Sequence, residues 1–381
     1  MRIMYVFTHL SQFGGVERVF IDKINYYCNL EDYEVFVYTV EQKNHPMSHP
    51  IDERCHVTHL GIRFTDSYKK KGIYRYCDIL RRQRNFYRVL RDCIDSIKPD
   101  VILSQADFYC DVIADIKGNT PFIIEAHSSY DHTRWYPQIN YLQRIMRYFY
   151  FRKFRKAQKI VCLTEGDALL WKKRNPNVQV IPNVVHLNED NTFSICKNKR
   201  VIFVGRFAYQ KGWWHLFDIW SRVHKKFPDW SLEIYGEGED ELDVIKCIKN
   251  KGIEDSVNIH KPTSNIFPEY KKSSILMLTS IYEPFGLVLP EAMSCGLPVI
   301  SFRGEGPDDI ITDGEDGFLV EQYDIDSYCE KLSKLMESEE LRKRMGEKGI
   351  ISSKRYSADK IMPQWLDLFE NLTRCGQQSQ T

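Results

Sequence analysis

Short apolar runs rich in β-branched residues alternate with longer amphipathic segments along the chain. This alternation is typical of βαβ units, in which parallel strands are covered by helices. In the first half we expect strands at Ile3–Thr8, Val35–Val40, Val101–Ser104, Phe122–Ala126 and Ile160–Leu163, and helices at Val16–Cys28, Tyr74–Ile97 and Tyr141–Lys156.

A polar segment without periodicity, Asn188 to Lys199, follows this series and is the best candidate for a linker. A second series then begins. Its expected strands are Val201–Val204, Leu232–Tyr235, Val257–Ile259, Ile275–Leu278, Val299–Ser301 and Gly317–Val320, and its expected helices are Trp213–Lys226, Glu239–Lys251, Leu287–Ser294, Ser327–Glu337 and Glu340–Lys354. A last helix is expected from Ala358 to Leu372.

The pattern therefore predicts an α/β protein with two Rossmann-like, doubly wound domains. Open α/β sheets bind ligands at the carboxyl ends of their strands, so we expect both domains to contribute to one cleft. The length agrees, because 381 residues exceed what one compact core usually holds.

Composition narrows the class of protein. No apolar run approaches the ~20 residues of a membrane span, and the first residues are too quickly polar for a signal peptide. The eleven cysteines form no C-x-x-C pair, which argues against a secreted disulfide framework. We expect reduced cysteines and a cytoplasmic protein.

Charge is divided unevenly between the two halves. Residues 1–185 hold 28 Lys and Arg against 20 Asp and Glu, a net +8, whereas the rest of the chain has a net −7. The two halves should therefore meet different partners.

The segment from Glu283 to Glu291 has the strongest group of candidate functional residues. The apolar turn Phe285-Gly286-Leu287 separates the first carboxylate from the start of a helix, and Glu291 lies more than a turn inside that helix. A helix N-terminus offers unpaired N–H groups to an anion such as a phosphate. One carboxylate could then reach a sugar and the other the ribose behind the phosphate.

Other candidate groups also follow predicted strands. Arg206 and Lys211 come after the first strand of the second series and suit a diphosphate, although such cations are often simply solvated. Gly14-Gly15 and Gly236-Glu237 occupy equivalent loops, where glycines permit close approach of a ligand.

His127 ends the strand Phe122–Ala126 and is either a structural or a catalytic histidine. Tyr130 and Trp135 follow it, and they could stack on an acceptor sugar or pack the domain.

Several of these motifs together resemble the retaining GT-B glycosyltransferases of family 4, especially bacterial polysaccharide and lipopolysaccharide hexosyltransferases. The resemblance rests on the E-x(7)-E spacing of Glu283 and Glu291, on Gly-Arg-x(4)-Lys-Gly ending at Gly212, and on Gly-Gly-x-Glu-Arg from Gly14. It implies an N-terminal acceptor-side domain at 1–185, a nucleotide-sugar domain at 186–356, and a helix within 357–381 that crosses back to the first domain.

The resemblance also implies an activity, the transfer of a hexose or N-acetylhexosamine from a UDP-sugar to a glycan or lipid-linked glycan, with retention and without a metal or other cofactor. The alternatives are a sugar-nucleotide epimerase of the same architecture and a catalytically idle nucleotide-sugar binding protein. The implied catalytic residues are Glu283, His127, Arg206 and Lys211; the implied donor-binding residues are Gly14, Gly15, Arg206, Lys211, Gly236, Glu237, Phe285, Gly286, Leu287 and Glu291; and the implied acceptor residues are Tyr130 and Trp135.

Cations interleaved with aromatic residues between Arg63 and Arg91, and again from Arg144 to Lys159, suit an anionic bilayer surface. A solvated helix face over a packed core is the alternative interpretation. We predict peripheral contact with the cytoplasmic face of a membrane, and nothing in the motifs indicates nucleic acid.

Overall fold

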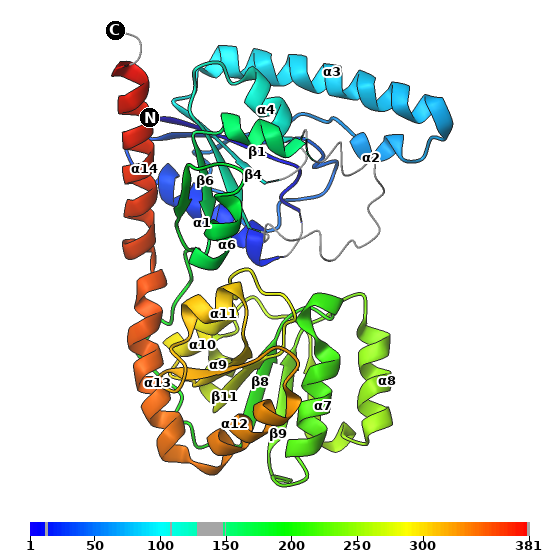
Figure 1. Cartoon of the computed structure of the whole chain (residues 1–381), viewed down its shortest axis with the longest axis vertical. Helices are drawn as coiled ribbons and strands as arrows, with labels where there is room; N and C mark the ends of the chain where they lie inside the picture. Colours follow the sequence, from blue (N-terminus) through cyan, green and yellow to red (C-terminus); the bar gives the residue numbers. More distant parts are fainter. Residues whose placement is uncertain (12–13, 107–108, 128–147, 149, 379–381) are drawn as a thin grey trace. The chain divides into compact units, whose positions relative to one another are not determined.

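The computed structural model describes residues 1–11, 14–106, 109–127, 148 and 150–378 (Figure 1). The chain forms two compact units. The first comprises Met1–Val184 together with Met362–Thr381, and the second comprises Val185–Ile361.

The N-terminal unit is built on a seven-stranded parallel sheet with the order β3-β2-β1-β4-β5-β6-β7. The central strands are buried except for Arg2 and Gln105 at their ends, because helices cover both faces. The strands are β1 (Arg2–Phe7), β2 (Glu34–Thr39), β3 (His56–His59), β4 (Val101–Gln105), β5 (Phe122–Ala126), β6 (Lys159–Cys162) and β7 (Val178–Val180).

Side chains alternate between the two faces of this sheet, so each strand feeds two apolar layers. Met4 and Val6 of β1 belong to the core beneath the long helix α3, whereas Tyr5 and Phe7 pack on Phe20 of α1. The helices are α1 (Gly15–Cys28), α2 (Phe64–Ser67), α3 (Gly72–Ile97), α4 (Cys110–Ile116) and α6 (Glu165–Trp171), with a 3-10 turn at Phe154–Lys156.

The C-terminal unit repeats this plan with a six-stranded parallel sheet of order β10-β9-β8-β11-β12-β13. Helix α7 packs against α8 and α12, and α10 packs against α9 and α13. The strands are β8 (Arg200–Val204), β9 (Ser231–Tyr235), β10 (Val257–His260), β11 (Ile275–Leu278), β12 (Val299–Phe302) and β13 (Gly317–Val320). The helices are α7 (Trp213–Val223), α8 (Glu241–Lys251), α9 (Phe267–Lys272), α10 (Val288–Ser294), α11 (Glu305–Ile310), α12 (Ile325–Glu337) and α13 (Glu339–Ser353), with 3-10 turns at Tyr209–Lys211, Glu254–Ser256 and Lys354–Tyr356.

The last helix, α14 (Ala358–Gln378), joins the N-terminal unit from Met362 onward. Its apolar stripe places Phe369 against Tyr27 of α1, with 5.5 Å between the ring centroids. None of the described helices is both long and apolar enough to cross a membrane.

The predicted α/β fold class is confirmed, and every predicted strand is present within one or two residues. Two strands escaped prediction. β3 reads His-Val-Thr-His and is mostly exposed at the sheet edge, and β7 is a short edge strand, so neither has the apolar signature of a central strand. The start of the helix predicted at Tyr141–Lys156 lies outside the described residues.

The predicted linker is wrong. The segment Asn188 to Lys199 belongs to the C-terminal unit, where the Ser194 amide donates to the Cys295 carbonyl at 2.8 Å and Cys196 is buried. The buried guanidinium of Arg342 donates to the Cys196 carbonyl at 2.9 Å. The packing could not be predicted from the sequence, because the segment has a polar composition and is attached largely through hydrogen bonds to its backbone groups rather than through a regular set of apolar side chains.

Candidate functional site

The candidate site of the C-terminal unit lies where the strand order of its sheet reverses. β8 and β11 are neighbours there, but the chain leaves them toward opposite sides of the sheet, a place at which α/β proteins bind ligands. Lys211 follows β8 and Glu283 follows β11, and Lys211 Nζ donates to Glu283 Oε2 at 2.5 Å. Ser280 Oγ donates to the same carboxylate oxygen at 3.0 Å.

Close backbone contact between the two loops explains why this pair meets. Gly212 has φ +58°, and a β-carbon there would lie 2.2 Å from the Thr279 carbonyl oxygen. The Ile281 amide donates to the Gln210 carbonyl at 2.9 Å, and Thr279 Oγ1 donates to the Lys211 carbonyl at 3.2 Å. Only glycine fits this approach, so Gly212 fixes the position of Lys211.

The turn after Glu283 is equally tight. Gly286 has φ +92°, and the Gly306 amide donates to the Glu283 carbonyl at 3.0 Å. A β-carbon on Gly306 would lie 2.1 Å from the Phe285 carbonyl oxygen, so this loop is pressed against the start of α11. Phe285 is buried and packs its ring on Tyr356. Phe285 therefore anchors the turn, and its predicted contribution to the donor site stays a prediction.

Helix α10 begins one residue later than predicted, with Leu287 as its N-cap residue, and Glu291 lies in its first turn rather than beyond it. Glu291 is buried, and one of its oxygens accepts a hydrogen bond from the Tyr270 hydroxyl at 3.3 Å.

Arg206 and the loop after β9 complete this end of the sheet. Arg206 is exposed, and its side chain has no hydrogen bond or ion pair to any residue that the structure describes. A β-carbon on Gly236 would lie 2.0 Å from the Gly205 carbonyl oxygen, and the Phe207 amide donates to the Glu237 carbonyl at 2.9 Å. The glycines thus hold two loops together, and the side chain of Glu237 is exposed.

In the N-terminal unit, the predicted residues also lie at the carboxyl ends of strands. Gly14 is the extended N-cap residue of α1 after β1, and Gly15 is the first residue of that helix. His127 follows β5 and is buried, with Nε2 3.2 Å from Glu125 Oε2. Tyr130 and Trp135 lie outside the described residues. That both units contribute to one ligand site stays a prediction.

Sequence reasoning missed Lys23 and Glu125, which form a buried ion pair beside His127. Their signal was visible, since each interrupts an apolar pattern. Lys23 stands among buried residues of α1, and Glu125 stands in the otherwise apolar strand β5. Nothing in either pattern indicated the other residue as its partner.

Among the described residues, no group of three or more His, Cys, Asp or Glu side chains is arranged to hold a metal ion. The chain has an Asp-x-Asp sequence at Asp324-Ile325-Asp326. Asp324 caps α12 by accepting from the Ser327 amide at 3.0 Å, and Asp326 pairs with Arg222.

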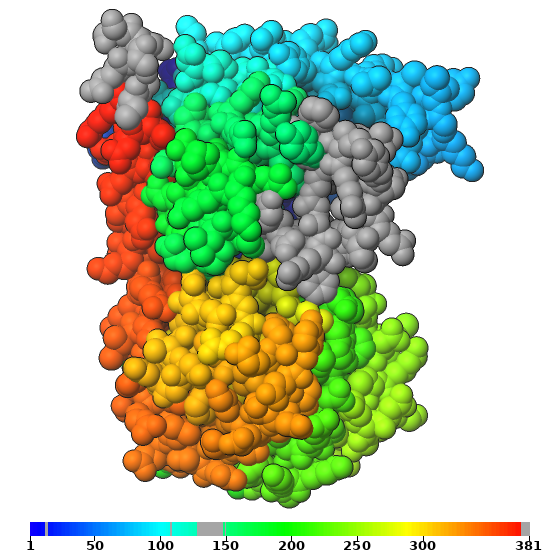
Figure 2. Space-filling view, in the orientation of Figure 1, coloured from blue at the N-terminus to red at the C-terminus, as the bar shows by residue number. Residues whose placement is uncertain are grey.

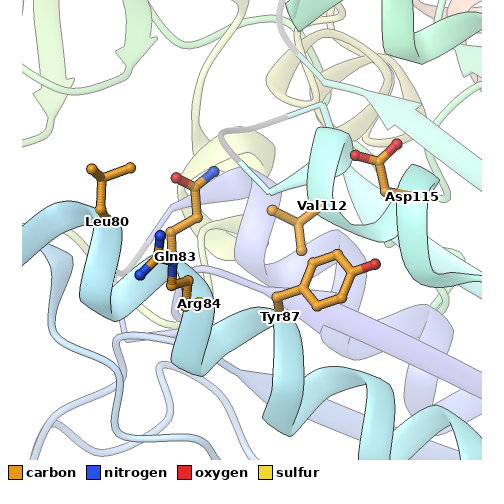
Figure 3. A pocket seen from close by; sticks show the side chains of 6 residues that line it. All are labelled: Leu80, Gln83, Arg84, Tyr87, Val112 and Asp115. Carbon is orange, nitrogen blue, oxygen red and sulfur yellow. The ribbon is translucent and has the colours of Figure 1, made fainter.

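A pocket of about 280 Å³ lies apart from these residues, between α3 and α4 (Figure 3). Leu80, Gln83, Arg84 and Tyr87 of α3 face Val112 and Asp115 of α4 across it. None of the predicted site residues that the structure describes lines this pocket.

Two family models match the chain and together span nearly all of it. The model described as Glycosyltransferase Family 4 matches residues 13–189, and the model described as Glycosyl transferases group 1 matches residues 188–351. The junction of the two models lies close to the boundary between the structural units.

Two curated relatives are similar in sequence. An uncharacterized glycosyltransferase of Haemophilus influenzae is 29% identical over 367 residues, which are 96% of this chain and 98% of that protein. The amylovoran biosynthesis glycosyltransferase AmsD of Erwinia amylovora is 34% identical over 221 residues, and this match spans 56% of our chain and 62% of AmsD.

Two solved structures share the fold. S. aureus TarM, solved as a point mutant with fondaparinux, α-GlcNAc-glycerol and UDP, matches with a TM-score of 0.75 and 16% identity over 97% of this chain and 100% of its own. The apo form of WaaB, a lipopolysaccharide outer core galactosyltransferase, matches with a TM-score of 0.70 and 20% identity over the whole of both chains.

Proposed function

Because the chain belongs to the GT-B glycosyltransferases of family 4, we propose that it is a retaining hexosyltransferase. The donor is a UDP-sugar, carrying a hexose or N-acetylhexosamine, and the acceptor is a glycan or lipid-linked glycan of a cell-surface polysaccharide. The observation that carries the proposal is the Lys211–Glu283 pair at the switch point of the C-terminal sheet. UDP in the TarM structure and the name of AmsD support the donor and the polysaccharide acceptor.

In this proposal the Lys211–Glu283 pair places a cation for the diphosphate and a carboxylate for the sugar in one loop cluster. Lys211 supplies a compact positive charge, and the exposed Arg206 supplies a planar fork of donors for the diphosphate. When the bond to the sugar breaks, negative charge accumulates on that diphosphate, and fixed cations stabilise it. No metal ion or other cofactor takes part in this proposal.

In this proposal Glu283 binds the donor sugar. Its carboxylate is already fixed by Lys211 and by the Ser280 hydroxyl, so it offers its remaining acceptor capacity in a set direction to sugar hydroxyls. Glu291, held by Tyr270, takes the ribose. Gly14, Gly15 and His127 of the N-terminal unit act on the same donor in this proposal.

Glu283→Gln should lower the rate of transfer by about ten- to a hundredfold, because an amide forms weaker hydrogen bonds to hydroxyls than a carboxylate does. The affinity for UDP, measured by calorimetry, should stay near that of the wild type. Glu315→Gln is the matched control, since Glu315 is exposed and pairs with Lys348 in the same unit. A collapse of UDP binding in Glu283→Gln would assign Glu283 to the nucleotide instead.

The proposed reaction is tested with a panel of nucleotide sugars. The preferred donor should raise the melting temperature, because it binds the folded state. Incubation with an acceptor should then give an α-linked glycoside from an α-linked donor, which the anomeric coupling in proton NMR measures. A β-linked product contradicts retention. Formation of a new sugar nucleotide would identify an epimerase, and binding without turnover an idle protein.

We also propose that the lipid-linked acceptor is met at a membrane, through the start of α3. Three large hydrophobic side chains are exposed there. The solvent-exposed fraction is 78% for Tyr74, 72% for Ile73 and 68% for Tyr76. This end of α3 projects beyond the sheet of its own unit (Figures 1 and 2). Leu80 and Arg84 continue the face toward the pocket between α3 and α4.

Not every cation near this face is available to lipids. Lys70, Arg81 and Arg82 converge on the buried Asp78, with the nearest contact 2.8 Å from Arg82 Nε. Hydrogen bonds from Arg82, Lys70 and Ser67 hold the pKa of Asp78 well below its usual range. These three cations therefore stabilise the α2–α3 corner, and charge reversal there would damage the fold rather than test the surface.

The membrane test accordingly reverses exposed cations only. Lys69→Glu/Lys71→Glu/Arg84→Glu should lower cosedimentation with anionic liposomes at low salt at least tenfold, since each cation near such a surface contributes about 1 kcal/mol. Donor hydrolysis should be unchanged. Lys246→Glu/Lys249→Glu/Lys334→Glu, on the C-terminal unit, is the control. Equal binding of the wild type to anionic and neutral liposomes would contradict the proposal.

A further inference from the structure

Lys23, Glu125 and His127, each at most 5% exposed, meet on one face of the N-terminal sheet. Glu125 and His127 are two residues apart and therefore project to the same face, where they meet Lys23 of α1. Glu125 Oε2 accepts a hydrogen bond from Lys23 Nζ and lies 3.2 Å from His127 Nε2. Burying two charges costs several kcal/mol per ion before their attraction is counted, so such a pair is unusual in a core.

The last helix of the chain covers this pair. Lys23 Nζ lies 4.0 Å from the centre of the Trp365 ring of α14 and 5.1 Å from that of Phe20. An ammonium over aromatic faces gains cation–π attraction, which grows as water is excluded. Trp365 is buried. Burial lowers the pKa of Lys23, whereas the charge of Glu125 and the two aromatic faces favour the ammonium form.

Tyr5 and Tyr27 are the other titratable groups facing Glu125. Burial raises the pKa of both phenols, and the charge of Glu125 raises it further, so both stay neutral. Burial alone would raise the pKa of Glu125, but the charge of Lys23 and the hydrogen bond from His127 outweigh burial and lower it. Glu125 is therefore an anion balanced by Lys23.

This arrangement decides which nitrogen of His127 carries the proton. Burial lowers the pKa of His127, although Glu125 acts in the opposite direction, so the imidazole is neutral at pH 7. Because Nε2 faces an anion, the proton belongs on Nε2, and Nδ1 keeps its lone pair. Nδ1 is buried and has no hydrogen-bond partner among the residues that the structure describes. The ring is held against Phe20, with centroids 4.4 Å apart.

We propose that Glu125, balanced by Lys23, is a positioning residue that holds His127 as the Nε2-protonated tautomer, so that Nδ1 accepts a hydrogen bond from a hydroxyl of the bound sugar. This inference rests on the proposed function for the identity of the ligand, but not for the tautomer. Lys23 is essential to it. Without that cation, Glu125 would take a proton or turn His127 into an imidazolium, and Nδ1 would become a donor in the second case.

The first test is a spectrum of the free enzyme. In protein labelled with nitrogen-15 histidine, the His127 signals, assigned by their absence in His127→Gln, should show a neutral ring protonated at Nε2 at pH 7. Glu125→Gln should change that pattern, because a neutral amide no longer favours the proton on Nε2 over Nδ1 as an anion does. A His127 ring protonated at Nδ1, or an imidazolium, overturns the inference, as does a Glu125→Gln spectrum identical to the wild type. The wild-type spectrum decides the tautomer even if Glu125→Gln does not fold.

The second test links the tautomer to the sugar. Glu125→Gln should lower kcat/KM for transfer about tenfold or more, the effect of one lost hydrogen bond, and should shift its pH profile. Asp167→Asn is the matched control, a buried carboxylate of the same unit that accepts from the Trp171 indole at 2.9 Å. Altered His127 signals together with an unaltered pH profile and rate would overturn the link to the sugar. If the wild type transfers no sugar from any donor, the proposed function fails, whereas the spectrum still decides the tautomer.

Discussion

Lys211→Ala should lower the rate of sugar transfer by about two to three orders of magnitude. A fixed charge at the position where negative charge develops is worth ~3–4 kcal/mol, and Lys211 lies at the switch point of the C-terminal sheet with its ammonium already held by Glu283. Arg206→Ala should have a similar effect, although Arg206 is exposed and contributes nothing visible to the packing. Steady-state kinetics with the preferred donor measures both.

The controls separate loss of catalysis from loss of fold. Lys246→Ala and Arg222→Ala remove exposed cations of the same unit, each paired with one aspartate, and should leave transfer unchanged. Thermal unfolding of Arg206→Ala should stay close to that of the wild type. Lys211→Ala leaves the buried Glu283 without its cation and should lose some stability, so circular dichroism at the assay temperature is needed to show that this variant is still folded. Near-normal transfer by both variants would contradict the assignment of these residues to the diphosphate.

Lys23→Met should destabilise the N-terminal unit by about 3–5 kcal/mol, the cost of leaving a buried charge without its partner. Glu125 is only 1% exposed beneath Trp365, so without Lys23 it must stay an unpaired carboxylate, take up a proton or turn His127 into an imidazolium, and each of these costs free energy. The double variant Lys23→Met/Glu125→Gln should lose less stability than the sum of the two single variants, because it buries no unpaired charge. Urea unfolding followed by circular dichroism measures these differences.

A surface pair provides the comparison. Lys153 contacts Asp115 at 2.7 Å but is 38% exposed, so Lys153→Met should cost at most about 1 kcal/mol. A Lys23→Met variant as stable as Lys153→Met would mean that Glu125 is neutral in the folded protein. In that case Lys23 would not be the cation that balances it.

Much of the fold could be predicted because the chain repeats one unit of local structure. Central strands such as β4 and β11 are short apolar runs, and the amphipathic segments between them form the covering helices, so their positions could be read within one or two residues. The edge strand β3 could not, since an edge strand has no second neighbour and its side chains are largely exposed. The segment from Asn188 to Lys199 was misread because hydrogen bonds, several of them to its backbone groups, attach it to the C-terminal unit in place of an apolar pattern.

The candidate residues of the C-terminal unit were predictable for a related reason. Lys211 and Glu283 each follow a strand, and the carboxyl ends of neighbouring parallel strands meet at one edge of a sheet. The sequence does not show, however, how close the side chains of Lys211 and Glu283 lie to each other. That Lys211 donates directly to Glu283 depends on Gly212, whose backbone approaches the loop after β11 more closely than any other residue would permit.

By itself, then, the sequence determined two doubly wound sheets and the loops that carry Arg206, Lys211, Glu283 and His127. Only the tertiary structure decided how His127 is held. Its partner Glu125 is balanced by a lysine about a hundred residues earlier in the chain and covered by a tryptophan in the last helix. Whether a buried charge is stable depends on what lies within a few ångströms of it in space, and local sequence patterns carry no information about neighbours so distant along the chain.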